Sequence, residues 1–359
     1  MSLEVIYVVR HGFRTSWSVD HSTGKYTATI RSPTNLPTDP ALTSHGVEQA
    51  NELAVHLRQL HPPIEKVYSS PYYRCMQTIQ PFVRHPRHSH ISENVSGDST
   101  IGICVDLGLS EWYGLAHFEH PSSAPLDELR GFFPELDASY ASTPAPERHG
   151  ESLPQLHDRV AKAIGSIIRR SDREGHKAVL ISTHAAVVIA LGRVLTGQME
   201  KDFGAFTCGL SKYKRRSSDD GQPPIDLGLK TGPWGITSAA RGRSQIGEVR
   251  PEGHSDTEPA GDADPHRYDS ERPGLGLLIR DNPERYGGWI CELDSDCSFL
   301  RGGEERGWKF SGDESFIETD SDGSVWPSNT ASTPVTAVDR TGLETHNSHN
   351  TPNVSTSKL

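Results

Sequence analysis

The stretch LEVIYVVRHG, residues 3–12, decides the fold of this chain. Residues 3–9 are mostly apolar and rich in β-branched side chains, which is typical of a short strand buried on both faces in a parallel sheet. This strand runs directly into Arg10, His11 and Gly12. Because sites in parallel sheets lie beyond the carboxyl ends of the strands, we expect the chemistry of the protein at this end.

Strands and helices alternate along the first part of the chain. Further strands are predicted over 64–69 and 178–182, and helices are predicted to begin near Thr43, Ser70, Ser152 and Ala185. Ser152 with Gln155 has the pattern of a capping box, and Ser70 before a proline is typical of a helix start. The stretches 16–40 and 84–150 are interpreted as loops, the second with short helices. The alternation predicts an α/β fold in which helices cover both faces of a mainly parallel sheet.

Charge is distributed unevenly along the 359 residues, whose net charge is −11. The charges of residues 1–216 nearly balance, so almost all of the excess acidity lies in the remainder. No apolar run approaches the ~20 residues that span a bilayer, and the acidic balance argues against a basic nucleic-acid-binding domain. We therefore predict one globular domain over 1–215, followed by a largely disordered acidic tail.

One aromatic island interrupts this acidic remainder. Residues 216–285 are predicted to be a disordered linker, and residues 318–359 a disordered tail. Between them, 286–317 carries aromatic residues on both sides of Gly302-Gly303, which indicates a β-hairpin. An isolated hairpin is marginal in water, so we expect this one to pack on the globular domain or on a partner protein.

The cysteines and the first residues bear on cellular compartment. Five irregularly spaced cysteines do not form the pattern of a disulfide framework, and Cys291 with Cys297 lacks the second pair expected of a zinc site. The first residues lack the charged and apolar regions of a signal peptide. We therefore expect a cytoplasmic and/or nuclear protein.

Arg10 and His11 suit an anionic substrate. A guanidinium group binds phosphate oxygens in bidentate fashion, and a neutral imidazole can attack phosphorus. Gly12 lets the backbone approach closely. The triplet on its own is a weak signal, because many such triplets are accidental.

Three further residues fall near the ends of predicted strands or between apolar neighbours. Arg74 lies in the first turn of the helix that follows a strand, where free N–H groups favour anions. His184 ends a buried strand, a position that is more often structural than catalytic. Glu111 lies among apolar residues, where burial would raise its pKa as a general acid requires.

Together, in this order, these motifs resemble the histidine phosphatase superfamily, also called phosphoglycerate mutase-like, over roughly residues 1–215. The resemblance implies a three-layer α/β/α fold and a phosphorylated nucleophile at His11. It also implies that Arg10, Arg74 and His184 form the phosphate pocket, and that Glu111 protonates the leaving oxygen. No metal and no cofactor are expected, since the basic side chains supply the positive charge.

Departures from the superfamily pattern narrow the expected activity. The stretch Phe13–Trp17 differs from the Glu-Ser pattern of the mutases, which favours a phosphatase. Arg14 matches the Arg-His-Gly-x-Arg pattern of the acid phosphatases. It is expected to bind phosphate as a third arginine beside Arg10 and Arg74. Ala185 follows His184 where that branch has aspartate, so Glu111 is the expected leaving-group acid. The expected substrate is a phosphorylated small molecule or a phosphoprotein.

The aromatic island carries a second resemblance. Residues 288–316 look like the C-terminal region of a fungal subunit of the polymerase III transcription factor TFIIIC, which joins a histidine phosphatase domain to a dimerisation segment. The resemblance implies an alternative function as an interaction platform, with a protein partner bound through 286–317. The basic run 212–216 is either a nuclear-import patch or a solvated helix end. Direct binding of nucleic acid or of a membrane is not expected.

Overall fold

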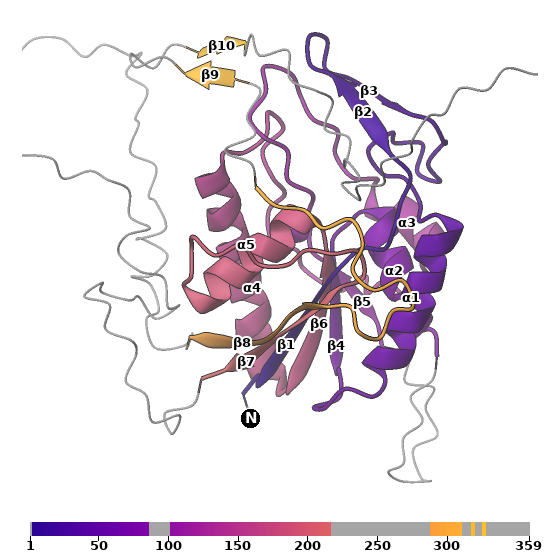
Figure 1. The fold of residues 1–359 in the computed structure, drawn as a ribbon, viewed down its shortest axis with the longest axis vertical. Coiled ribbons are helices and arrows are strands. Elements are labelled where there is room, and N and C mark those ends of the chain that lie inside the picture. The colour runs from indigo at the N-terminus through magenta and orange to yellow at the C-terminus, as the bar shows by residue number, and fades with distance from the viewer. Residues whose placement is uncertain (1, 86–100, 217–287, 311–316, 320–324, 328–359) are drawn as a thin grey trace, which may run out of the picture.

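The computed structural model describes residues 2–85, 101–216 and 288–310, together with the backbone of two short strands farther along. A six-stranded sheet in the order β5-β4-β6-β1-β7-β8 forms the middle layer (Figure 1). Its strands are β1 (Val5–Arg10), β4 (Lys66–Ser69), β5 (Ile103–Val105), β6 (Ala178–Thr183), β7 (Leu210–Arg215) and β8 (Trp289–Asp296). The first four strands of that order run parallel, whereas β7 and β8 are antiparallel to their neighbours. The sheet is therefore mainly parallel, as predicted.

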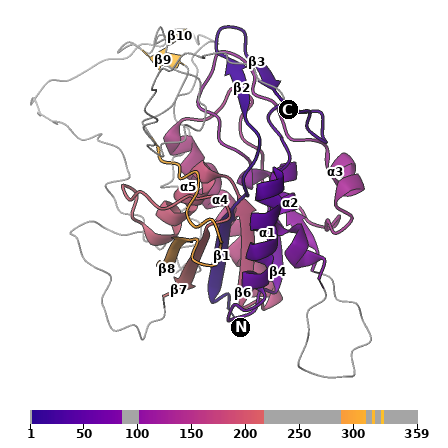
Figure 2. The same cartoon turned by 45° about the vertical axis from the view of Figure 1, so that its right-hand side comes forward.

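Helices cover both faces of this sheet. They are α1 (Ser44–Leu57), α2 (Tyr73–Val83), α3 (Leu126–Phe132), α4 (Leu153–Glu174) and α5 (Ala185–Thr196), with a short 3-10 helix, η1 (Leu107–Leu109). Because side chains alternate along a strand, Ile6 and Val8 of β1 enter the core under α4 and α5. Tyr7 and Val9 enter the core under α1 and α2. Figures 1 and 2 show these two helix layers on opposite sides of the sheet, which confirms the predicted three-layer fold.

Capping residues predicted from the sequence start two of these helices. The Thr43 hydroxyl accepts a hydrogen bond from the Gly46 N–H at the start of α1. Ser152 and Gln155 form the predicted capping box of α4. The predicted start of α2 is wrong, because that helix begins at Tyr73 and has no side-chain cap. The hydroxyl of Ser70 bonds His184 instead, so a tertiary partner replaces the local cap.

Two stretches have strands where none was predicted. The 16–40 stretch contains a small hairpin of β2 (Trp17–Asp20) and β3 (Lys25–Ala28), which lies beyond the end of the central sheet (Figure 1). The basic run 212–216 belongs largely to β7, so its interpretation as a helix end is wrong, whereas the import patch stays a prediction. Its Tyr213 is fully buried, and the run pairs with β1 on one side. Pairing with a distant strand has no signature in a charged run, so the local pattern was misleading.

The C-terminal island adds the last strand to the sheet. β8 pairs antiparallel with β7, from Arg215 opposite Trp289 to Leu210 opposite Asp296. This differs from the predicted hairpin around Gly302-Gly303, because the free edge of β7 supplies the hydrogen-bond partners. Residues 297–310, here named the C-terminal strap, form turns and irregular chain. The folded unit thus extends past the predicted boundary at residue 215.

Two short strands, β9 (Ile317–Thr319) and β10 (Val325–Pro327), pair with each other; β9 begins at the last residue of the predicted segment 286–317, and β10 lies in the predicted tail. The rest of the predicted linker 216–285 and tail 318–359 lies outside the described residues, apart from residue 216. In the described part of the chain, no helix has the length and apolar character needed to cross a membrane.

Candidate active site

The six side chains singled out in the sequence converge at the carboxyl ends of β4, β6 and β1. Arg10 ends β1 with His11 after it, Arg74 lies in the first turn of α2 beyond β4, and His184 follows β6. Because β4, β6 and β1 are neighbours in the sheet, these residues meet. All four are buried, and the rings of His11 and His184 are 5.5 Å apart between centroids.

His11 is held as a neutral imidazole. Its Nδ1 lies 2.9 Å from the carbonyl oxygen of Gly12, which only accepts, so Nδ1 carries the proton and Nε2 keeps its lone pair. Burial, together with the nearby Arg74 and Arg10, holds the pKa of His11 well below its usual 6.5. A neutral imidazole with a free Nε2 is the form that acts as a nucleophile.

Arg74, Glu111 and His184 form a contiguous polar cluster. Arg74 Nη2 donates to Glu111 Oε2 at 3.0 Å, and His184 Nδ1 lies 3.2 Å from the same oxygen. The hydroxyl of Ser70 bonds His184 Nε2 at 2.7 Å, so both ring nitrogens are engaged. Asp39 and the Thr38 carbonyl hold the other side of the Arg74 guanidinium.

The pKa of Glu111 contradicts the expectation from its sequence context. Burial alone raises this pKa, but His184 and Arg74 lower it further than burial raises it, so the net shift is downward. Burial is also the largest influence on His184, whose pKa falls to about 4. Glu111 is therefore ionised when no substrate is bound. Apolar neighbours in the sequence did not reveal the arginine that tertiary folding places beside it.

Three arginines of this region each carry a buried donor that has no partner in the described part of the chain. Within the described residues, the Nε–H groups of Arg10, Arg14 and Arg74 are buried and make no hydrogen bond. Burial lowers the pKa of Arg10 to about 10 and that of Arg14 to about 9, and repulsion from Arg74 adds to both shifts. Buried donors without a partner, on cations that repel one another, favour binding of a multiply charged anion.

A metal ion fits this geometry less well than an anion. One ligand atom each of His11, Glu111 and His184 lies within 4.8 Å of the others, close enough to share a cation. Arg10, Arg14 and Arg74 surround the same place with positive charge, which opposes a second cation. The donor set therefore favours phosphate chemistry over metal chemistry, and the absence of a metal cofactor stays a prediction.

Sequence reasoning missed the contributions of Ser70 and Tyr72. Tyr72 packs its ring edge-on against His184 at 5.0 Å and lies 4.7 Å from the Arg74 guanidinium. Its hydroxyl is 3.2 Å from that of Tyr113. The position of both residues in the short turn after a predicted strand was the available signal, and it was interpreted only as a helix start.

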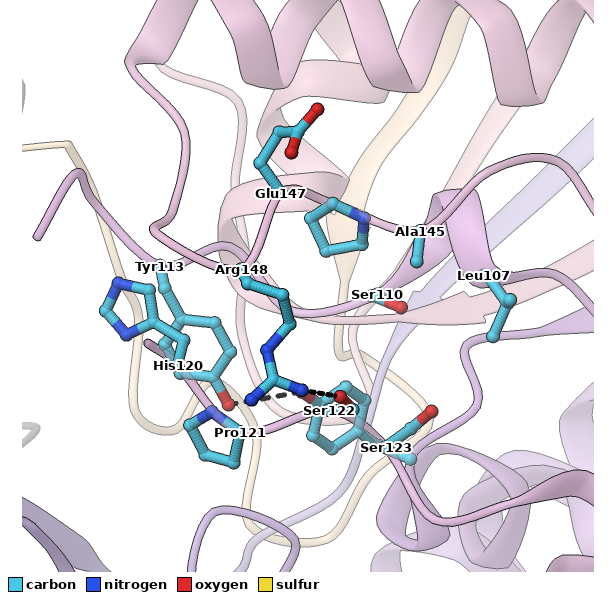
Figure 3. Close-up of a pocket in the computed structure, with 12 residues that line it drawn as sticks. Leu107, Ser110, Tyr113, His120, Pro121, Ser122, Ser123, Ala145, Glu147 and Arg148 are labelled. Carbon is cyan, nitrogen blue, oxygen red and sulfur yellow. Dashed lines mark hydrogen bonds between the residues drawn. The ribbon is translucent and has the colours of Figure 1, made fainter. Parts of the chain in front are cut away.

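An aromatic-sided pocket adjoins the cluster (Figure 3). Tyr72, Ser110 and Tyr113 form one side of it, and the loops 120–123 and 145–148 form the rest. In Figure 3, Arg148 reaches across the pocket to Ser122. Tyr72 of this pocket contacts His184 and Arg74 of the cluster, so the loops around the pocket lie beside the candidate site.

Comparisons of the sequence with known proteins find named relatives. The chain is 32% identical over 201 residues to the transcription factor tau 55 kDa subunit of Saccharomyces cerevisiae, covering 55% of this chain and 42% of that protein. It is 26% identical over 214 residues to the ecdysteroid-phosphate phosphatase of Drosophila melanogaster, covering 54% of this chain and 27% of that protein. The chain thus spans less than half the length of these curated relatives.

A solved structure, ecdysone phosphate phosphatase from Bombix mori in complex with tungstate, aligns with a TM-score of 0.42 at 19% identity, covering 62% of this chain and 98% of that one. A sequence model described as histidine phosphatase superfamily (branch 1) matches residues 6–227, which is more than half of the chain. The chain therefore belongs to the histidine phosphatase superfamily, branch 1.

Proposed function

We propose that this protein is a metal-independent phosphomonoesterase that acts through a phosphohistidine at His11. One observation carries the proposal: His11 with its free Nε2 lies among Arg10, Arg14 and Arg74, whose buried Nε–H groups have no partner among the described residues. This arrangement joins a nucleophile to donors that match phosphate oxygens. The substrate class is a phosphorylated small molecule or a phosphoprotein.

The first step forms an N–P bond and breaks a P–O bond. His11 Nε2 attacks phosphorus while the three guanidinium groups bind the non-bridging oxygens, where negative charge accumulates. His184 joins them by exchanging its Nδ1 contact with Glu111 for a phosphate oxygen. The leaving oxygen takes a proton and departs as an alcohol or phenol. Water then attacks the phosphohistidine, its proton passes to a base, and inorganic phosphate is released with neutral His11 restored.

Glu111 is the group that exchanges the proton with the leaving oxygen and with water. Since its pKa is lowered in the protein by itself, it must gain a proton when substrate binds. A phosphate group offsets the positive charge around His184, Arg74 and Arg14, which counteracts the causes of the lowered pKa. A substrate that enters as the monoanion brings the proton with it. The ionised state of Glu111 also suits the second step, in which it accepts a proton from water.

Turnover of p-nitrophenyl phosphate tests this function directly. The wild-type protein is assayed with and without a metal chelator, next to His11→Ala and a control, His117→Ala, which alters an exposed histidine. We expect turnover that resists the chelator, persists in His117→Ala and disappears in His11→Ala. Turnover that survives in His11→Ala, or is lost to the chelator, would reject the mechanism.

A second function is supported by the likeness to the yeast tau 55 kDa subunit, at 32% identity. In this proposal the domain is a nuclear interaction platform within a TFIIIC-type transcription factor, and residues 286–317 contribute to partner binding. The two functions are compatible, because an intact site can persist on a scaffold. Purification of the tagged full-length chain from its own cells decides: recovery without any subunit of a polymerase III transcription factor rejects the platform function.

A further inference from the structure

The C-terminal strap, residues 297–310, lies along one face of α1. Its partners on that helix are spaced four, three and four residues apart, which places them on a single stripe. They are His45, Gln49, Glu52 and His56. Arg301 binds Glu52 through both its side chain and its backbone N–H, and Phe299 stacks on His56 with ring centroids 4.3 Å apart. The strap is thus anchored to α1, the first α-helix after His11 in the chain.

Glu305 links the strap to the edge of the active site through two residues of α1. Its carboxylate lies 2.7 Å from His45 Nε2 and accepts from Gln49 Nε2 at 3.2 Å. The side-chain oxygen of the same Gln49 accepts from the backbone N–H of Phe13, two residues after His11. The Glu305 carbonyl accepts from the Thr207 N–H. Gln49 therefore ties the strap and the Arg-His-Gly turn to one side chain.

Arg306 makes the contact with the phosphate-binding machinery. Arg10 Nη1 donates to two backbone carbonyls, Ala205 at 2.6 Å and Arg306 at 2.5 Å. Two fixed acceptors on one nitrogen set the plane of the guanidinium and leave its Nε–H unpaired within the described residues. The guanidinium of Arg306 itself lies 3.8 Å from the ring centroid of Phe13. The strap thus contacts both residues that flank the His11–Gly12 pair.

The backbone of Arg306 is in an unusual conformation that aims this carbonyl. Its φ is +47°, in the left-handed region that disfavours most side chains and β-branched ones most. The Glu305 contacts and the Arg306–Phe13 contact hold the residue there. A conformation of this kind persists only where its surroundings over-determine it.

We propose that Arg306 is a positioning residue for phosphate binding: its carbonyl orients Arg10, and the Glu305 anchor holds that carbonyl in place. Arg306 acts through Arg10 and not by touching phosphate. The inference rests on the proposed function, since it names a device that prepares the same site. Residues 297–310 then belong to the active site although they follow β7 by about eighty residues.

Two substitutions of Arg306 in the full-length protein separate its backbone from its side chain. Arg306→Gly and Arg306→Val both remove the guanidinium, but glycine accepts a φ of +47° and valine opposes it. Binding of inorganic phosphate is measured by titration calorimetry below the melting temperature of each variant. We expect phosphate to bind about tenfold more weakly to Arg306→Val than to Arg306→Gly, as the misplacement of one charge-assisted contact implies. Equal affinities for the two variants would overturn the proposal.

An Arg10→Ala background shows whether the effect passes through Arg10. There the difference between the valine and glycine variants should vanish, because the group that the carbonyl orients is gone. A difference that persists overturns the proposal. Glu305→Gln, which leaves the backbone at 306 intact but loosens the anchor, should weaken phosphate binding in the same direction, and an unchanged affinity counts against the anchor.

The same titrations keep this inference apart from the proposed function. A wild-type protein that binds phosphate but does not turn over p-nitrophenyl phosphate rejects the proposed function, while the valine–glycine comparison still decides the role of Arg306. A wild-type protein that binds no phosphate overturns both.

Discussion

Replacing Arg74 by methionine tests how the buried charges of the site stabilise the fold. Arg74 is fully buried, and its guanidinium lies 3.4 Å from Asp39 and 3.0 Å from Glu111. Methionine keeps much of the side-chain length but not the charge, so two carboxyl groups lose their arginine. Removing one partner of a buried ion pair costs about 3–5 kcal/mol, and we expect the free energy of unfolding to fall by about that amount.

The free energy of unfolding lost in Arg74→Met should be larger near neutral pH than in acid. Burial raises the pKa of Asp39 above its ordinary 3.8, and Arg74 partly opposes that shift. Without Arg74 the pKa of folded Asp39 rises further. A carboxyl whose folded pKa exceeds its unfolded value favours the folded state at low pH, and this contribution is lost as pH rises through the folded pKa. The deficit of Arg74→Met is therefore largest near neutral pH and shrinks in acid.

Denaturant unfolding followed by tryptophan fluorescence measures this deficit, and Arg84→Met is the matched control. Arg84 lies only 2.6 Å from Glu135, but its side chain is 52% exposed. Surface ion pairs contribute less than about 1 kcal/mol to stability. Arg84→Met should therefore lose less free energy of unfolding than Arg74→Met, although the Arg84–Glu135 distance is the shorter one. If Arg74→Met loses no more than Arg84→Met, or if its deficit is the same in acid, the reasoning from burial is wrong.

Three further expectations concern pH, the His184 contact and the added strand. Because the pKa of His11 is held well below 6.5, the acid limb of kcat/KM should lie below pH 6.5, and a limb above that value would contradict a neutral nucleophile. Ser70→Ala leaves His184 Nε2 with only the weak 3.6 Å contact to Cys75 Sγ and should lower the free energy of unfolding by about 1–3 kcal/mol, measured by denaturation. Trp289→Ala removes a side chain that is 1% exposed and should cost about 3–5 kcal/mol, whereas an unchanged midpoint would show that β8 does not support the domain.

Local patterns predicted the elements that carry the site. The apolar β-branched run of β1 forms a strand with every residue buried, and the capping box at Ser152 forms as predicted. These signals depend on periodicity and on contacts between near neighbours, so the sequence contains them directly. The same patterns failed at the basic strand β7 and at the loop interpreted over 16–40, because strand pairing there is decided by partners elsewhere.

The sequence by itself determined the fold class and the basic and imidazole groups at the carboxyl ends of the parallel strands. Only the tertiary structure decided the charge state of Glu111, since His184 and Arg74 reach it from separate elements. It also decided that β8 completes the sheet and that the Arg306 carbonyl holds Arg10, a contact that joins residues 296 positions apart. The physical reason is common to all three: hydrogen bonds and Coulomb interactions act over a few ångströms in space, whatever the separation along the chain.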